Sequence, residues 1–224
     1  MSDCLICLEN VGFAYEPGRP ILERCNLRLD AGQRVGLVGA NGSGKTTLLA
    51  MIVGLVKPDA GRLEVLGKVR RNETEFHEIR GRVGLLFQDG DDQLFCPTVA
   101  EDVAFGPMNL GKSRRQVQRI VADTLASLGL EGYEERITYK LSGGEKRLVS
   151  LATVLAMEPE VLLLDEPTAG LDEEAAERVT EILLDLPQAM LIVSHDRPFL
   201  ARLATRTLRL TGGALEPIDL GCLW

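Results

Sequence analysis

The chain has 224 residues, of which 45% are hydrophobic, and a formal net charge of −8. This length suffices for one sizeable hydrophobic core and is short for two independent full domains, so we expect a single domain with at most one inserted lobe. The negative charge repels nucleic-acid phosphates and argues against direct binding of DNA or RNA.

The N-terminal segment lacks the basic and apolar regions of a secretory signal, and no apolar run reaches the roughly 18 residues of a bilayer span. We therefore expect a cytoplasmic protein that contacts a membrane only through partners. The five cysteines fit reduced thiols better than a disulfide framework. Cys4 and Cys7 form a CxxC in a β-rich run, where residues three apart should point to opposite faces. This spacing predicts ordinary thiols rather than a zinc or redox site.

The first predicted elements are strands. Residues 4–9 and 21–29 alternate in hydrophobicity around a turn-rich segment at 16–20, which predicts an antiparallel β portion. Arg34–Val38 is a short apolar run that ends in a glycine-rich loop, and a helical pattern starts near Lys45. Strand-like segments recur at Arg62–Leu66, Arg82–Phe87, Val161–Leu164, Met190–Val193 and Arg206–Leu210. Several of them are apolar throughout, as is typical of a parallel sheet covered on both faces.

Between Thr98 and Met157 the pattern becomes mainly helical, and Ser113–Leu128 and Ser142–Ala156 are the clearest predicted helices. Strands on both sides of this stretch predict a helical lobe inserted into an α/β core.

The segment Gly39-Ala-Asn-Gly-Ser-Gly-Lys-Thr46 matches GxxxxGK[ST] between a predicted strand and a predicted helix, which is the context of a phosphate-binding loop. Glycines let backbone N–H groups surround the β- and γ-phosphates, Lys45 neutralises their charge, and the Thr46 hydroxyl binds Mg²⁺. A chance glycine turn is the alternative, and the flanking elements argue against it. The nucleotide-binding residues predicted here are Asn41, Gly42, Ser43, Gly44, Lys45, Thr46 and Thr47.

Two carboxylates follow the apolar strand Val161–Leu164, at the edge where ligands bind in open α/β sheets. Asp165 is expected to hold Mg²⁺, usually through water, and Glu166 to act as the general base for attack on the γ-phosphate. Gln88 and His195 also follow predicted strands. Gln88 would coordinate Mg²⁺ or the attacking water, and His195 would donate a hydrogen bond to the γ-phosphate. Solvated strand ends and a structural histidine are the alternatives.

The segment Leu141-Ser-Gly-Gly-Glu145, the helix after it and the run VLLLDEPTAGLD from Val161 resemble the signature, Walker B and D-loop of the nucleotide-binding subunits of ABC transporters. The resemblance covers nearly the whole chain. It implies a P-loop NTPase (RecA-like) α/β fold with an N-terminal antiparallel β subdomain and an inserted helical subdomain. Residues 1–224 would form one domain, with a nucleotide-binding core at 1–96 and 158–224 and the helical subdomain at 97–157.

The same resemblance implies roles for single residues. Tyr15 looks like the aromatic residue that stacks on adenine, Gln88 like the Q-loop glutamine, Asp172 like the D-loop aspartate and His195 like the H-loop histidine. Glu145 stands where many members have glutamine. Because an acidic side chain near a phosphate is unfavourable, we expect Glu145 to point away and the nucleotide to be met by Ser142 and the backbone of Gly143 and Gly144.

Further implications concern activity and partners. The family hydrolyses ATP with Mg²⁺, and two subunits sandwich ATP head to tail, so this chain would form a homodimer or a heterodimer with a second ABC ATPase subunit. It would lie on the inner face of the cell membrane, bound to transmembrane subunits.

A narrower resemblance lies in Phe87–Phe95 and Pro97–Pro107, which look like the energy-coupling-factor group that imports cobalt, nickel or vitamins. Gly90 stands where proline is usual. In that group this segment lies beside the surface that receives the membrane partner. Leu94 and Phe95 are apolar residues in an acidic loop, which favours a partner surface; packing inside the helical lobe is the alternative.

The leading interpretation is therefore an ATPase subunit that powers a membrane importer. Three other classes stay open: a nucleic-acid repair or translation ABC ATPase, a P-loop kinase for a small molecule, and a non-hydrolysing module. The charge and the absence of long insertions oppose the first, the signature opposes the second, and Glu166 opposes the third.

Overall fold

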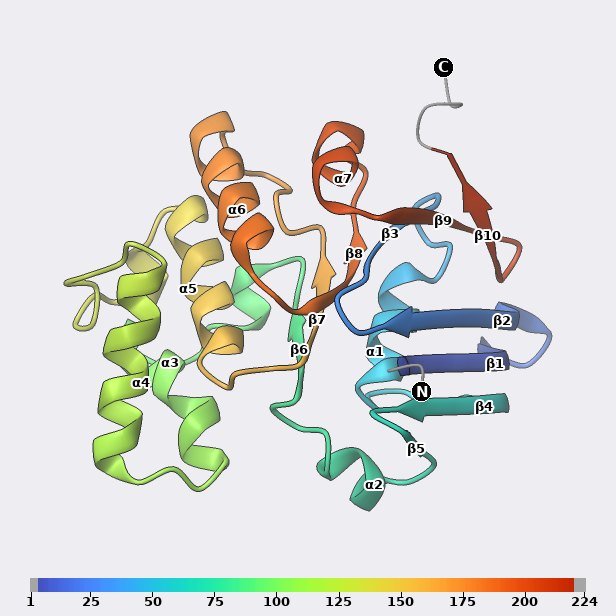
Figure 1. Cartoon of the computed structure of the whole chain (residues 1–224), viewed down its shortest axis with the longest axis horizontal. Coiled ribbons are helices and arrows are strands. Elements are labelled where there is room, and N and C mark those ends of the chain that lie inside the picture. Colours follow the sequence, from blue (N-terminus) through green and yellow to red (C-terminus); the bar gives the residue numbers. More distant parts are fainter. Residues whose placement is uncertain (1–3, 220–224) are drawn as a thin grey trace.

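The computed structural model describes residues 4–219 of the chain. Its strands form two sheets (Figure 1). The first sheet is antiparallel and has the order β2-β1-β4-β5, which confirms the predicted N-terminal β portion. Its strands are β1 (Cys4–Glu16), β2 (Arg19–Asp30), β4 (Ala60–Val65) and β5 (Lys68–Val69).

The second sheet has six strands in the order β10-β9-β3-β8-β7-β6. All its pairings are parallel except that of β10 with β9. The strands are β3 (Arg34–Val38), β6 (Val83–Leu86), β7 (Val161–Asp165), β8 (Ala189–Val193), β9 (Arg206–Thr211) and β10 (Ala214–Ile218).

The helices surround this parallel sheet. In Figure 1, α3, α4 and α5 form a lobe at the left, and α6 and α7 lie above the strands. The α-helices are α1 (Lys45–Ile52), α2 (Glu73–His77), α3 (Val99–Asn109), α4 (Arg114–Ser127), α5 (Gly143–Leu155), α6 (Glu173–Asp185) and α7 (Arg197–Leu203), and two short 3₁₀ turns are η1 (Gly90–Asp92) and η2 (Thr138–Lys140).

The three helices of the lobe start in the same way. Thr98, Ser113 and Ser142 each accept a hydrogen bond from the backbone three residues later, where a Glu or Gln side chain bonds back to the cap. Such capping boxes satisfy backbone groups that a helix start would otherwise leave unpaired. They fix where each helix begins, including the signature helix α5.

The parallel strands separate two hydrophobic cores. In β7, Val161 and Leu163 pack into the core shared with the antiparallel sheet and α1, whereas Leu162 and Leu164 pack into the core shared with the helical lobe, α6 and α7. Successive residues of a strand face opposite sides, so a strand between two cores must be apolar throughout. This requirement explains the unbroken apolar runs in the sequence.

The first strand departs from strict alternation. The pairing of β1 with β2 shifts register between Cys4 and Ile6. The Cys4 thiol donates to Ile6 O and the Cys7 thiol to Glu9 Oε1, and burial, followed by the charge of Cys4, raises the pKa of Cys7. Within residues 4–219 no cluster of three or more His, Cys, Asp or Glu side chains could hold a metal.

None of the helices in the described part of the chain is long and apolar enough to cross a bilayer.

Candidate active site

The carboxyl ends of β3, β6, β7 and β8 meet at one edge of the parallel sheet, because these strands run in the same direction. The loops that leave this edge, together with the end of β1, surround a cleft of about 640 Å³. Its lining residues are Tyr15, Ile21, Asn41, Gly42, Gly44, Lys45, Thr46, Thr47, Gln88, Asp165, Glu166, Ala169 and His195.

The N-terminus of α1 opens into this cleft. Gly44 precedes the helix with φ of 103°, and a Cβ there would lie 2.6 Å from Ile21 Cγ2, so the position requires glycine. No side chain caps the helix, which leaves its first N–H groups and its positive dipole end for an anion. The Lys45 ammonium donates to the carbonyls of Gly39 (2.8 Å) and Ala40 (3.1 Å). Burial lowers the pKa of Lys45, while Glu166 and Asp165 oppose that shift.

The apex of this loop is tightly packed. Asn41 and Gly42 line the cleft, whereas Ser43 lines a neighbouring hollow. The Ser43 hydroxyl is buried and has no hydrogen-bond partner among the described residues. A Cβ on Gly39 would lie 2.7 Å from that hydroxyl, so the first glycine of the motif makes room for the serine.

The predicted metal ligands converge at the start of α1. Thr46 Oγ1 donates a 2.7 Å hydrogen bond to Asp165 Oδ2, and Gln88 lines the same cleft. A hydroxyl, a carboxylate and an amide oxygen are the donor types that Mg²⁺ prefers, in a site completed by water and phosphate. These three side chains therefore fit a magnesium ion.

Glu166 has an unusual backbone and one unpaired oxygen. Its φ is 46°, in the left-handed region that non-glycine residues rarely adopt. Its N–H donates to Val193 O (2.9 Å), and Oε2 accepts from the N–H of His195 (3.2 Å). Oε1 is buried with no hydrogen bond from any described residue, and His195 Nε2 lies 3.4 Å away. A buried acceptor without a donor is suited to take a proton from a bound water.

Tyr15 lies on the other side of the cleft. Its side chain is 63% exposed, packs edge-on against Phe13 at 4.8 Å between ring centroids, and has its hydroxyl 3.3 Å from Thr47 Oγ1. An exposed ring beside a phosphate loop is available to stack on a planar base.

Besides Ser43, four predicted nucleotide contacts lie outside this cleft. Ser142 caps α5, Gly143 lines an adjacent hollow, and Gly144 packs against Ala175, since a Cβ on it would lie 3.0 Å from Ala175 Cβ. Asp172 caps α6 and accepts from Ala175 N at 2.8 Å. None of these four residues lines the cleft of the phosphate loop, although the hollow beside Gly143 also includes Thr46 and Asp165.

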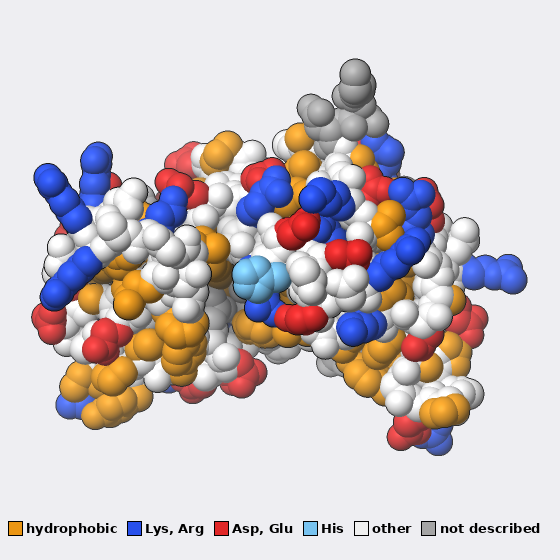
Figure 2. Space-filling model, turned by 90° about the horizontal axis from the view of Figure 1, so that it is seen from below, with side chains coloured by type: hydrophobic (Ala, Val, Ile, Leu, Met, Phe, Trp, Pro, Cys, Tyr) orange, Lys and Arg blue, Asp and Glu red, His pale blue; other side chains and the backbone are white. Residues whose placement is uncertain are grey.

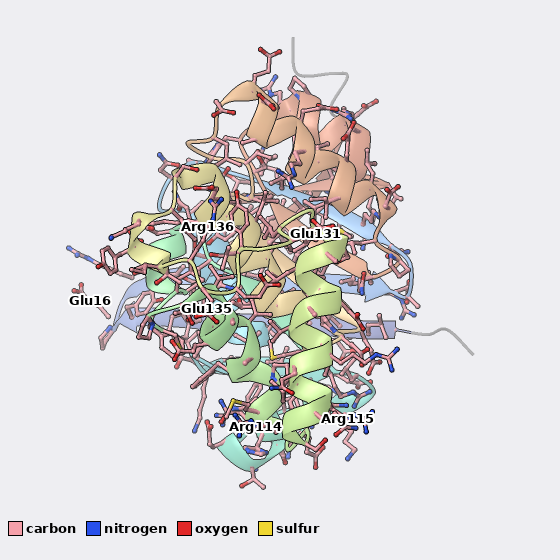
Figure 3. The ribbon with its side chains drawn as sticks, turned by 90° about the vertical axis from the view of Figure 1, so that its left-hand side faces the viewer. Glu16, Arg114, Arg115, Glu131, Glu135 and Arg136 are labelled. Atoms are coloured by element: carbon pink, nitrogen blue, oxygen red, sulfur yellow. The ribbon has the colours of Figure 1, made fainter. Side chains whose placement is uncertain are left out.

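The Glu145 carboxylate is held inside the helical lobe. It accepts hydrogen bonds from Ser142 N (2.8 Å), Tyr133 Oη (2.8 Å) and Arg136 Nη1 (2.7 Å). The Arg136 guanidinium also lies 3.6 Å from the centroid of the Tyr133 ring. Figure 3 shows Arg136 on the loop beyond α4, far from Arg114 and Arg115 at the other end of that helix. The backbone N–H of Ser142, followed by Tyr133, lowers the pKa of Glu145, so the carboxylate stays ionised and forms an ion pair with Arg136.

Arg147 is a residue that sequence patterns did not predict, and the structure places it behind the site. It is 4% exposed and donates hydrogen bonds to Phe87 O, Gln88 O and Glu166 O. The only sequence signal is a basic residue among the apolar positions of the signature helix.

Comparisons with known proteins agree with this geometry. The chain matches the ABC transporter family over residues 22–169. It is 52% identical to a putative ABC transporter ATP-binding protein of Brucella suis over 95% of this chain and 88% of that protein. It is 44% identical to the energy-coupling factor transporter ATP-binding protein EcfA of Methanothermobacter thermautotrophicus over 94% of this chain and 69% of that protein.

Solved structures show the same fold. The structure of cbiO1 from Clostridium perfringens, described as part of the ABC transporter complex cbiONQ, has a TM-score of 0.86 at 31% identity over 96% of this chain and 87% of that one. A dimeric ATP-binding cassette bound to ADP and Pi has a TM-score of 0.87 at 26% identity over 96% of this chain and 99% of that one. With a complete phosphate loop, an acidic pair at the sheet edge and these relatives, the chain belongs to the ABC transporter family as an ATP-binding, ATP-hydrolysing subunit.

Proposed function

We propose that this subunit powers a membrane importer of the energy-coupling-factor type, for cobalt, nickel or a vitamin, and that Glu166 activates the water that hydrolyses ATP. The observation that carries the catalytic part is the buried Oε1 of Glu166, which accepts no hydrogen bond from the described residues, at the cleft that also holds the Thr46–Asp165 pair. The relatives named EcfA and cbiO support the transport class.

The residues around the cleft have different roles in this reaction. Tyr15 stacks on adenine, and the phosphate loop with Lys45 holds the phosphates. Thr46, Asp165 and Gln88 would hold Mg²⁺, which supplies charge neutralisation at the β- and γ-phosphates. His195, whose Nε2 lies beside the carboxylate, donates to the γ-phosphate, while Glu166 takes the proton from water.

The signature residues complete the site from a second ATPase subunit. Ser142, Gly143, Gly144 and Asp172 lie outside the cleft of their own chain. In a head-to-tail pair, homodimeric or heterodimeric, they would meet the nucleotide bound to the partner. The dimeric relative solved with ADP and Pi supports this arrangement.

The membrane partner would dock in a groove of about 570 Å³ between the helical lobe and the core. Phe95 is 65% exposed at this groove and packs edge-on against Phe105 at 4.8 Å between ring centroids, whereas Leu94 packs against the core of the lobe. Figure 2 shows hydrophobic side chains gathered on the left-hand lobe, which holds α3 and α4. Through this contact the subunit would lie on the inner face of the membrane.

The test of the catalytic assignment is Glu166→Gln, which keeps the size of the side chain but removes the carboxylate. Hydrolysis should fall by roughly 10²-fold or more, as for the loss of a positioned base. With Mg-ATP the variant should form a long-lived dimer in size-exclusion chromatography. Glu131→Gln makes the same change at an exposed position after α4 (Figure 3) and should behave as wild type. A Glu166→Gln variant that stays monomeric and turns over ATP normally would refute the role.

A further inference from the structure

Arg147 joins three segments that belong to different parts of the molecule. It lies on α5, five residues after the cap Ser142, and its side chain is buried. Its guanidinium donates to Phe87 O at 2.6 Å and to Gln88 O in the loop after β6, and to Glu166 O at 3.3 Å after β7. The planar guanidinium, with five N–H donors, can serve several carbonyls at once.

Burial of this cation is costly, because a charged group loses its hydration. In residues 4–219 no carboxylate lies within ion-pair distance of the Arg147 guanidinium. Burial lowers its pKa, and the nearby charges of Asp89, Asp165 and Glu166 only oppose that shift. A buried apolar side chain would avoid the desolvation penalty. The hydrogen bonds to the three carbonyls are thus what the charged group adds to the structure.

The loop after β6 is attached to α5 at two further points. Gln93 Nε2 donates to Ser150 O and Thr153 Oγ1, each at 2.8 Å. The Lys146 ammonium lies 2.5 Å from Asp91 Oδ1. This loop therefore moves with the signature helix, and of its attachments to α5 Arg147 is the one that also reaches the carbonyl of Glu166.

Glu166 needs such support because its backbone is strained. A residue other than glycine is disfavoured at a φ of 46° and stays there only where surrounding contacts impose it. Its N–H donates to Val193 O, its Oε2 accepts from His195 N, and its carbonyl accepts from Ala169 N at 3.1 Å; these partners lie in β8 and in the loops after β7 and β8. The Arg147 contact to its carbonyl is the one that comes from the helical lobe.

We propose that Arg147 is a positioning residue for hydrolysis: it makes the placement of the Glu166 carboxylate depend on the position of the signature helix and of the Gln88 loop. This inference rests on the proposed role of Glu166. When the helical lobe is displaced, the Arg147 contact loosens and the base leaves its reactive position, while nucleotide binding at the phosphate loop persists.

The experiment compares Arg147→Met, which fits an apolar site but has no donors, with Arg147→Lys, whose single ammonium cannot reach all three carbonyls. For Arg147→Met we expect kcat to fall roughly ten- to a hundredfold, as for a misplaced catalytic group. The affinity for a fluorescent ATP analogue should stay within about threefold, because ground-state binding is untouched. The kcat of Arg147→Lys should lie between those of Arg147→Met and wild type. This variant therefore still tests the proposal if Arg147→Met does not fold.

Two further variants separate positioning from stability. Arg178→Met removes a guanidinium that likewise donates to backbone carbonyls, those of Leu128 and Gly129, but contacts neither Glu166 nor the loop after β6, so it should lower the melting temperature and leave kcat unchanged. In a Glu166→Gln background, Arg147→Met should change the residual single-turnover rate by less than about twofold, because residues acting through one another are not additive.

A wild-type kcat in both Arg147 variants would overturn the proposal. So would an Arg147→Met substitution that lowers the rate as much in the Glu166→Gln background as in the wild-type protein. The proposal would also fail if turnover in Arg147→Met fell only because its affinity for the nucleotide fell by the same factor. Failure of the base assignment looks different, since Glu166→Gln alone would then keep wild-type turnover.

Discussion

At the residue scale, the Lys45 ammonium lies in a site that would be stabilised by a bound anion. It is 8% exposed, bonds two carbonyls and has a pKa lowered by burial. Phosphate oxygens would replace neutral acceptors with charged ones, which form stronger hydrogen bonds. Lys45→Ala should therefore weaken ATP binding at least about tenfold and abolish hydrolysis, with an unchanged circular dichroism spectrum. Lys57→Ala, at an exposed position, is the control; equal affinity in both variants would contradict the assignment.

Glu145 gives a second prediction at this scale, one that depends on pH. Its folded-state pKa lies below the ordinary value of 4.5, so its ionised form contributes stability above pH 4.5, and that contribution is lost as pH falls through the lowered value. Glu145→Gln should cost about 1 kcal/mol at pH 7, and the difference from wild type should shrink below pH 4.5. Urea unfolding of both proteins at pH 7 and pH 4 measures this difference in the free energy of unfolding. If the difference is the same at both pH values, the charge of Glu145 does not contribute to stability.

At the scale of elements, prediction from sequence succeeded where one physical cause dominates. The strand β7 and the loop before α1 were foreseen because burial on both faces and phosphate binding each demand a distinctive residue pattern. The irregular start of β1 was not foreseen, because its register shift does not depend on any distinctive residue type. Arg147 was missed for a similar reason: its three partners are backbone carbonyls, which look alike at every position of a sequence.

The junction of α1 with α2 offers a test of packing between elements. Gly54 follows α1 with φ of 84°, and a Cβ there would lie 2.4 Å from the Phe76 ring of α2, which is 2% exposed. Gly54→Ala should therefore add a steric clash of about 1–3 kcal/mol to the backbone strain of roughly 1 kcal/mol.

Gly67 is the matched control for this substitution. Its φ is 74°, but no atom of the described residues lies within 4 Å of the position that a Cβ would take. Gly67→Ala should therefore show the backbone strain without the steric clash. Thermal unfolding of both variants gives the difference. Equal melting temperatures would show that Phe76 moves aside and that α2 is not tightly packed on α1.

At the scale of the whole molecule, the proposed nucleotide cleft and the proposed docking groove are joined by one short segment. Gln88 lines the cleft and Phe95 lines the groove, and the N–H groups of Phe95 and Cys96 both bond Asp102 Oδ1 at 3.1 and 3.0 Å. Asp102 is 2% exposed in α3. Displacement of the lobe by nucleotide would therefore carry the Phe95 ring with it, as a population shift between two arrangements.

The Phe95 ring itself tests this coupling. Phe95→Ala removes an apolar side chain that is 65% exposed, so it should change stability little and leave basal ATP hydrolysis nearly unchanged. It should reduce co-purification with the transmembrane partner and lower transport, because an exposed aromatic anchor contributes strongly to an interface. Leu55→Ala, at a residue 64% exposed outside the groove, controls for the loss of surface hydrophobicity and should leave partner binding intact. If Phe95→Ala instead lost thermal stability and basal activity together, with partner binding retained per folded molecule, Phe95 would serve the core of the lobe and the groove would need another occupant.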